Sequence, residues 1–201
     1  MDIGIFGGSF DPIHTGHLML AESARTEAGL DRLIILPAYE SPFKVGQSNA
    51  SSEDRLEMAI RAAEGNEAME VSSFDIDKGK VSFMVDLLLE MEAMFAPEDK
   101  FYFISGTDSI LKIEKWKGSD VLLTRYGFVV GSRPGYRTEE LTEHVEHLKK
   151  TYGTDIRIVD IPQVDISSTD IRQRCQDGRT IKYLVPDKVE EYIIQNGLYK
   201  K

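Results

Sequence analysis

Apolar residues along the chain fall into two alternating patterns. Short runs rich in β-branched and aromatic residues predict strands at residues 3–6, 32–36, 70–73, 101–105, 127–130 and 156–158. Stretches with apolar residues at helical spacing predict helices at residues 18–28, 53–63, 81–94, 139–149, 168–175 and 187–195. Because strands alternate with helices, we expect parallel strands joined by right-handed crossovers.

Two of the predicted strands are apolar at every position in their middle, at residues 33–36 and 128–130. Such runs are typical of strands that are covered on both faces. We therefore predict an α/β fold with a doubly wound, mostly parallel sheet, of the Rossmann-like type. Ligands of such sheets bind at the carboxyl ends of the strands, and the motifs described below follow predicted strands or open predicted helices.

The composition excludes several classes of protein. A net charge of −10 argues against a broad nucleic-acid interface, so we expect no nucleic-acid partner. No run approaches the roughly 18 apolar residues of a membrane span, and the first residues lack a basic signal region, so we expect a cytoplasmic protein without a membrane partner. The single cysteine, Cys175, cannot form an internal disulfide, which fits a reducing compartment, and we expect it to be inert.

The string GGSFDPIHTGH, residues 7–17, follows the first predicted strand. Its leading glycines permit a tight turn and a close approach of backbone to ligand. If the helix begins near Thr15, His14 and His17 lie on one face beside free N–H groups and the positive end of the helix dipole, where a phosphate would bind well. Two other interpretations stay open: histidines without a catalytic role, and metal ligation together with Asp11.

The string ISSTDIR, residues 166–172, opens another predicted helix. Ser167 is a good N-cap, and Asp170 is spaced to complete a capping box with it. Taken alone, this string predicts only a well-capped helix. Arg172, however, falls in the first turns, where the helix dipole disfavours a cation, and a bound anion would resolve that conflict.

Together the two strings resemble the two signatures of the HxGH nucleotidyltransferases, and the chain as a whole is similar to the bacterial nicotinate-nucleotide adenylyltransferases. The resemblance implies one nucleotidyltransferase domain over residues 1–201, in which the C-terminal helical part, about 166–201, completes an ATP site. It implies catalytic roles for His14, His17 and Arg172. The residues that it implies for ATP binding are Gly7, Gly8, Ser9, Phe10, Gly16, Gly106, Asp108, Ser167, Ser168 and Thr169.

Further segments resemble the substrate site of that family. They are residues 37–44 (PAYESPFK), the FISGTD string at 103–108, Trp116 and the VGSRPG string at 130–135. The substrate-binding residues implied are Lys44, Ser82, Phe83, Met84, Trp116 and Arg133. The sequence departs from the family at Phe43, commonly histidine, and at residues 82–84, usually Ser-Tyr-Thr.

Four of the residues named above also have a purely structural interpretation. Asp108 fits the cap of a helix that starts near Ser109, Trp116 fits a core residue, Arg133 fits a turn and Lys44 fits a solvated surface. His144 and His147 are predicted to lie on a solvated helix face. The string containing Asp75, Asp77 and Gly79 is predicted to form a turn.

The implied reaction transfers AMP from ATP to nicotinic acid mononucleotide, giving nicotinic acid adenine dinucleotide and pyrophosphate. The implied cofactor is Mg²⁺ bound with ATP, without a dedicated protein metal site. The expected partners are ATP and a pyridine mononucleotide, and self-association into a homo-oligomer stays open. The alternatives are an adenylyltransferase for nicotinamide mononucleotide or phosphopantetheine, a cytidylyltransferase, and a non-catalytic nucleotide sensor on the same fold.

Overall fold

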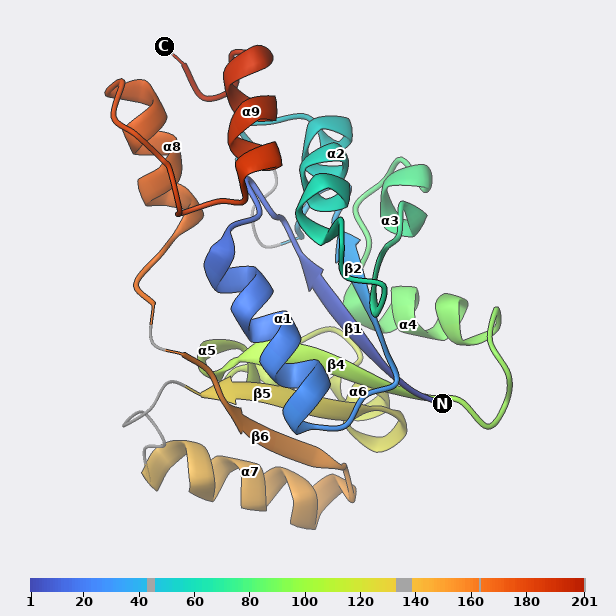
Figure 1. The fold of residues 1–201 in the computed structure, drawn as a ribbon. Helices are drawn as coiled ribbons and strands as arrows, with labels where there is room; N and C mark the ends of the chain where they lie inside the picture. The colour runs from blue at the N-terminus through green and yellow to red at the C-terminus, as the bar shows by residue number, and fades with distance from the viewer. Residues whose placement is uncertain (43–45, 133–138, 163, 201) are drawn as a thin grey trace. The chain divides into compact units, whose positions relative to one another are not determined.

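A six-stranded parallel sheet forms the framework of the protein, in a computed structural model that describes residues 1–42, 46–132, 139–162 and 164–200 (Figure 1). The strands are β1 (Asp2–Gly8), β2 (Arg32–Pro37), β3 (Met69–Val71), β4 (Lys100–Gly106), β5 (Gly127–Ser132) and β6 (Ile156–Asp160). Their order in the sheet is β3-β2-β1-β4-β5-β6. The predicted α/β class and the predicted strands are confirmed, and the continuously apolar runs in β2 and β5 are buried.

Helices connect the strands, mostly where the sequence predicts them. They are α1 (Thr15–Glu27), α2 (Ser52–Ala63), α3 (Phe74–Asp77), α4 (Met84–Glu92), α5 (Thr107–Ile110), the 3₁₀ helix η1 (Ile113–Lys115), α6 (Ser119–Arg125), α7 (Glu139–Tyr152), α8 (Ser168–Gln176) and α9 (Asp187–Gln195). The predicted helix at 81–94 is shorter than expected. Three short elements, α3, η1 and α6, were not predicted, because they span too few residues for a helical period to show. Helix α5 is the helix that the structural interpretation of Asp108 placed near Ser109, and it begins two residues earlier.

The chain divides into two compact units. The first comprises Met1–Phe6, Leu20–Ile34 and Phe83–Gln163, and the second comprises Gly7–Met19, Ile35–Ser82 and Val164–Lys201. The prediction of a single domain stays a prediction. Both predicted phosphate motifs, residues 7–17 and 166–172, lie within the second unit.

The first unit is built around β4 and β5, which pair in parallel with Phe103 opposite Phe128. Helix α5 packs on both strands, α6 packs against α4 and α7, and α7 lies along β6 (Figure 1). His144 on α7 is half-buried, and its Nε2 lies 3.1 Å from the carbonyl oxygen of Ile110. The prediction of a solvated face is therefore wrong for His144, because the N-terminal half of α7 turns this ring toward α5, whereas His147 is exposed as predicted.

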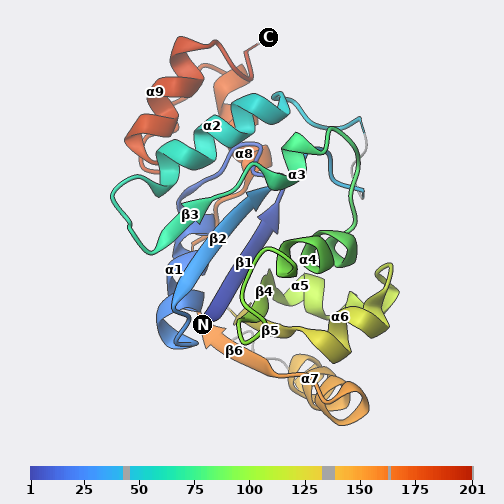
Figure 2. The same cartoon turned by 90° about the vertical axis from the view of Figure 1, so that its right-hand side faces the viewer.

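The second unit is organised around α2, which packs against β3 and α9 (Figure 2). The hydroxyl of Tyr192 on α9 donates to Asp54 on α2 at 2.9 Å, and the Arg61 guanidinium lies over the Tyr192 ring at 4.8 Å. Helix α9 is thereby tied to α2 by polar contacts as well as by its buried Val189 and Ile193. In the described part of the chain, no helix combines the length and the apolar character that crossing a bilayer requires.

Candidate functional site

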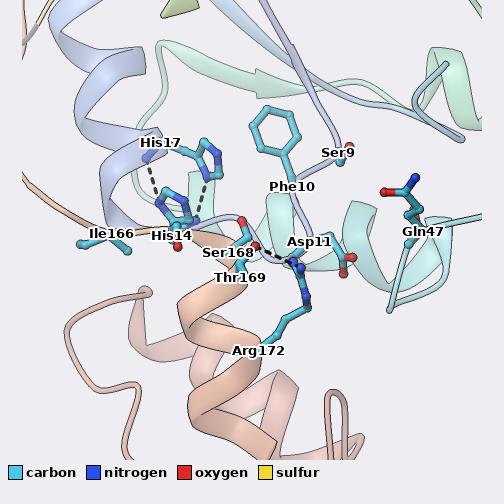
Figure 3. Close-up of a pocket in the computed structure, with 12 residues that line it drawn as sticks. Ser9, Phe10, Asp11, His14, His17, Gln47, Ile166, Ser168, Thr169 and Arg172 are labelled. Atoms are coloured by element: carbon cyan, nitrogen blue, oxygen red, sulfur yellow. Dashed lines mark hydrogen bonds between the residues drawn. The ribbon is translucent and has the colours of Figure 1, made fainter. Parts of the chain in front are cut away.

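A cavity of about 550 Å³ in the second unit brings the two sequence motifs together (Figure 3). Its walls come from the loop between β1 and α1, the start of α1, the loop before α2 and the start of α8. The lining residues are Ser9, Phe10, Asp11, His14, His17, Gln47, Ser48, Ile166, Ser167, Ser168, Thr169 and Arg172. Residues from both ends of the sequence therefore face one space.

The two imidazoles cap the start of α1 reciprocally. The His17 backbone N–H donates to Nδ1 of His14 at 3.3 Å, and the His14 backbone N–H donates to Nδ1 of His17 at 3.2 Å. This is the arrangement of a capping box, with imidazole nitrogens in place of the usual hydroxyl and carboxylate. The rings stack with their centroids 3.6 Å apart (Figure 3). Because both Nδ1 atoms accept hydrogen bonds, the ring proton of each neutral histidine is on Nε2.

Gly16 makes this stacking sterically feasible. A Cβ atom at residue 16 would lie only 3.2 Å from Nδ1 of His14, which folds back over the first turn of α1. A larger residue would therefore crowd the His14 ring, which would have to shift by a few tenths of an ångström. The glycine between the histidines, predicted as an ATP-binding residue, thus has a packing reason within the second unit.

Both histidines are neutral in this environment. Desolvation lowers the pKa of His14 to about 4, and desolvation together with the neighbouring His14 lowers the pKa of His17 well below its usual value. A histidine beside a helix start can be a cation, but here desolvation keeps both rings uncharged at neutral pH. They act there as neutral N–H donors rather than as fixed positive charges.

The start of α8 is capped differently. The Ser167 hydroxyl accepts from the Asp170 backbone N–H at 3.1 Å, as predicted for an N-cap. The second half of the predicted capping box is wrong, because the Asp170 carboxylate accepts from Nε of Arg174 at 2.7 Å instead. The Ser168 hydroxyl donates to the Pro12 carbonyl at 2.9 Å, which fastens α8 to the first motif.

Arg172 carries a positive charge that no carboxylate neutralises within the described residues. Its Nη1 donates to the Asp11 carbonyl at 2.7 Å, and its Nη2 donates to the Thr169 hydroxyl at 3.3 Å. Arg174, two residues further along α8, forms an ion pair with Asp170. A guanidinium with unused donors, held at a helix start that faces a cavity, is suited to bind an anion.

Backbone N–H groups complete the set of donors around the cavity. In the part of the chain that the structure describes, the N–H groups of Gly16, Ser168 and Thr169 have no hydrogen-bond acceptor. They belong to the first turns of α1 and α8, where orphan N–H groups and the helix dipole favour negative charge. The site therefore offers neutral imidazole donors, one guanidinium and two helix starts to an extended anion such as a polyphosphate.

Among the described residues that line the cavity, Asp11 is the one carboxylate, and its oxygens are already engaged. Oδ1 accepts from the Tyr199 hydroxyl at 2.8 Å and from the Ala50 N–H at 3.2 Å. Oδ2 accepts from the Asn49 N–H at 2.8 Å and from its Nδ2 at 3.4 Å. With four protein donors on its oxygens, Asp11 does not fit the alternative role of a metal ligand.

A buried network behind the cavity was not predicted. Arg55 on α2 is 1% exposed and donates to the carbonyls of Ser9 and Tyr39, each at 2.7 Å. The Tyr39 N–H donates to the buried carboxylate of Asp75 at 3.1 Å. The prediction of a turn at Asp75 is wrong, since it lies in α3. These charged residues fix the loops after β1 and β2. The contacts join residues far apart in sequence, so no local pattern predicts them.

Several predicted residues lie outside the cavity wall. Gly7 and Gly8 are the last residues of β1. Ser82 is buried, and its hydroxyl donates a hydrogen bond to the Lys80 carbonyl at 3.4 Å. Lys44 and Arg133 lie outside the described residues, and their roles stay predictions.

The remaining predicted residues belong to the first unit. Gly106 ends β4 and is the N-cap of α5, and the exposed Asp108 lies in the first turn of α5 rather than at its cap. Phe83 is the N-cap of α4 and Met84 its first residue. Trp116 is half-exposed, and its ring meets Phe103 edge-on at 5.8 Å. Their roles toward a nucleotide or a pyridine ring stay predictions.

Sequence reasoning missed Gln47 and Ser48, which line the cavity from the loop before α2. No motif marks them, because they reach the cavity only through the hydrogen bonds of the adjacent Asn49 to Asp11. Ile166 was recognised as part of the second motif but not as a lining residue.

Comparisons with known proteins agree on one family. The model described as "Cytidylyltransferase-like" matches residues 5–174. A protein of Thermoanaerobacter sp. (strain X514), named probable nicotinate-nucleotide adenylyltransferase, is 42% identical over 199 residues, covering 99% of this chain and 94% of that protein. A protein of the same name from Moorella thermoacetica is 41% identical, with 98% and 91% of the two chains covered.

A solved structure is similar in fold. The Plasmodium falciparum nicotinic acid mononucleotide adenylyltransferase complexed with NaAD has a TM-score of 0.79 to this chain. The alignment covers 98% of this chain and 97% of that one, at 22% sequence identity. This likeness supports the Rossmann-like nucleotidyltransferase fold.

Proposed function

The chain belongs to the cytidylyltransferase-like family and, within it, to the nicotinate-nucleotide adenylyltransferases, and we propose that it transfers the adenylyl group of ATP to nicotinic acid mononucleotide. The products are nicotinic acid adenine dinucleotide and pyrophosphate. The observation that carries the proposal is the donor set around the cavity, in which His14, His17 and Arg172 face one space at two helix starts. An ATP polyphosphate is an extended anion that such a set of donors can bind.

The acceptor needs no general base. A phosphate monoester has a second pKa near 6, so the mononucleotide phosphate is already a dianionic nucleophile at neutral pH. One of its oxygens attacks the α-phosphorus of ATP in line, a new P–O bond forms, and the bond to the β-phosphate oxygen breaks. Pyrophosphate leaves with the bonding electrons. Catalysis then depends on positioning and on stabilisation of charge.

The two histidines serve as fixed donors to the reacting phosphates. Their reciprocal hydrogen bonds hold both Nδ1 atoms as acceptors, and we assign each Nε2–H as a donor to the α- and β-phosphates. A donor that is held in place before the reaction loses no energy by reorienting during it. We assign to His17 the stabilisation of charge in the transition state.

Arg172 and the start of α8 hold the leaving group. The guanidinium supplies a permanent charge for the β- and γ-phosphates, and the N–H groups of Ser168 and Thr169 add neutral donors. Their position on a helix that is fastened to the first motif keeps them in register with the histidines. Pyrophosphate departure is thereby assisted without an acid that protonates it.

Mg²⁺ would enter with ATP as part of the substrate and would offset phosphate charge, and its reluctance to dehydrate fits a site without a dedicated set of protein ligands. Asp11 does not serve as its ligand, because four protein donors already occupy the carboxylate oxygens. The protein residues described above act on the phosphates directly. We expect the enzyme to work in the cytoplasm.

A pyrophosphate-release assay tests the proposal. We expect kcat/KM to be largest with nicotinic acid mononucleotide, lower with its amide, and negligible with phosphopantetheine. If none of the three acceptors supports pyrophosphate release from ATP, the proposed reaction is refuted. If phosphopantetheine is the preferred acceptor, the proposed substrate is refuted. The free thiol of Cys175, whose pKa is raised by burial, has no part in the reaction.

A further inference from the structure

The C-terminal tail reaches the phosphate cavity through a single hydroxyl. Tyr199, two residues from the end of the chain, donates its hydroxyl proton to Oδ1 of Asp11 at 2.8 Å. Resting on the proposed function, we propose that Tyr199 is a positioning residue for ATP, acting through Asp11 without touching the nucleotide. The tail beyond α9 then helps to hold Asp11, and through it the phosphate-binding residues, in position.

The local backbone delivers Tyr199 to this position. Helix α9 ends in a Schellman turn, in which the Gly197 N–H donates to the Ile194 carbonyl at 3.3 Å and the Leu198 N–H donates to the Ile193 carbonyl at 3.0 Å. Gly197 has φ +62, which this turn requires. The chain reverses there, and Tyr199 is buried with only 8% of its surface exposed.

Tyr199 also adopts a backbone conformation that costs energy. Its φ is +61, in the left-handed region that residues with a side chain rarely occupy. Such a conformation persists where the surroundings over-determine it. Here the surroundings are the burial of the ring and the hydrogen bond to Asp11.

Asp11 and its neighbour Phe10 contact both Arg172 and His17, so the position of Asp11 affects both groups. Its own carbonyl accepts from Nη1 of Arg172, so the placement of residue 11 sets the guanidinium. The residue before it, Phe10, has φ +47, and its ring packs edge-on against His17 with centroids 5.1 Å apart. A shift of Asp11 would therefore move the charged donor and the support of the imidazole together.

The Tyr199 hydroxyl is a permanent donor in this contact. Burial, reinforced by the carboxylate of Asp11, raises the pKa of Tyr199 well above its usual value, so the hydroxyl keeps its proton at neutral pH. The contact therefore persists over the whole working pH range. Replacing Tyr199 by Phe removes the donor and keeps the ring, which leaves one carboxylate oxygen with the Ala50 N–H alone.

The test compares Tyr199→Phe with the control variant Tyr192→Phe. The control also loses a hydrogen bond from a tyrosine to an aspartate, but this bond joins Tyr192 to Asp54 outside the cavity. ATP affinity is measured by calorimetry, and kcat and KM in the pyrophosphate-release assay. We expect Tyr199→Phe to raise the Kd and KM for ATP about 5- to 20-fold, less than the full effect of one hydrogen bond to a charged acceptor because Tyr199 acts through Asp11 and does not touch the nucleotide. Tyr192→Phe should leave both within about twofold of wild type.

A second pair of variants tests the tail by its backbone. Gly197→Ala strains the turn that delivers Tyr199, and Gly65→Ala introduces the same kind of strain after α2, where φ is +85. We expect Gly197→Ala to weaken ATP binding and Gly65→Ala to leave it unchanged, although both lower the melting temperature. A merely structural role for the tail would make the two variants alike.

The outcomes separate this inference from the proposed function. If wild type binds ATP but releases no pyrophosphate with any acceptor, the reaction is refuted, and the Kd ratios still decide the role of Tyr199. If wild type is active and Tyr199→Phe binds ATP as wild type does, the positioning role is refuted and the reaction stands. Wild type that fails to bind ATP refutes both.

Discussion

The starts of α1 and α8 face the same cavity, but they are built from different chemistry. At α1, two imidazoles cap each other's backbone N–H groups and are neutral because desolvation lowers their pKa. At α8, a serine hydroxyl caps the helix, and Arg172 keeps a charge that no carboxylate pairs with in the described chain. One helix start supplies positioned neutral donors, and the other supplies permanent charge.

The difference matches the two halves of a nucleotidyl transfer. Charge that develops at the α-phosphate is best met by donors that are fixed in direction, since a mobile cation would also stabilise the ground state. The departing pyrophosphate carries several negative charges in both states, for which a guanidinium is suited. Substitutions of His17, Arg172 and His14 each change one side of this comparison and keep the other intact, whereas a substitution of Trp116 leaves both sides unchanged.

The largest effect is expected from removing the imidazole at the start of α1. His17→Ala should lower kcat by on the order of 10²-fold or more, as the loss of a preorganised donor does. His17→Gln should lower it similarly and keep the fold, because a glutamine at this position can accept the capping hydrogen bond from the His14 N–H. Steady-state kinetics and melting temperatures measure both.

His147→Ala is the matched control for that prediction, since His147 is an exposed histidine on α7. It should leave kcat unchanged. A His17→Gln variant that folds and turns over at the wild-type rate would remove the catalytic role from α1.

On the other helix, Arg172→Ala should lower kcat/KM for ATP about 10- to 100-fold, the range for a charge-assisted hydrogen bond. Arg174→Ala, on the same helix, removes an ion pair with Asp170 that is partly exposed and should change kcat/KM by less than about twofold. Equal losses in the two variants would mean that charge on α8 acts generally and not at the cavity.

The neutrality of the α1 histidines predicts a dependence of stability on pH. The pKa of His14 is about 4 in the folded protein and 6.5 as a reference, so its contribution is present above pH 6.5 and is lost as the pH falls toward 4. Between pH 7 and pH 5, wild type should lose on the order of 2 kcal/mol from this group alone.

Urea unfolding at the two pH values measures that loss. His14→Asn keeps a good N-cap and removes the titrating ring, so its loss between pH 7 and pH 5 should be smaller by about that amount. If wild type and His14→Asn lose stability equally, His14 is not held neutral by its surroundings.

The smallest effect is expected from Trp116, which belongs to the other unit and stands outside the phosphate chemistry. Trp116→Ala should raise KM for the mononucleotide about 3- to 10-fold, the contribution of one aromatic stack, and leave KM for ATP nearly unchanged. Equal changes in the two KM values would rule out stacking on the pyridine ring.

The sequence predicts the framework well because its signals are periodic. Apolar runs locate β1 to β6, and the longer helices follow from their spacing. The N-cap at Ser167 is likewise a local pattern, in which one hydroxyl lies three residues before a backbone N–H. Short elements such as α6 leave too few residues for a period, and tertiary contacts decide them.

The candidate site is predictable only in its motifs. His14, His17 and Arg172 stand in strings that resemble family signatures, but their environment does not follow from the strings. The lowered histidine pKa values depend on desolvation by the folded chain. The buried Arg55 and the contact of Tyr199 with Asp11 join residues far apart in sequence, for which no local pattern exists.

Phosphorus-31 NMR of bound ATP, in the absence of acceptor, tests most directly whether the two helix starts hold one polyphosphate. We predict that His17→Gln changes the α-phosphate resonance of the bound nucleotide and leaves the γ-phosphate near its wild-type shift. Arg172→Ala should change the β- and γ-phosphates and leave the α-phosphate. ATP that binds both variants with all three resonances at their wild-type shifts would contradict the account.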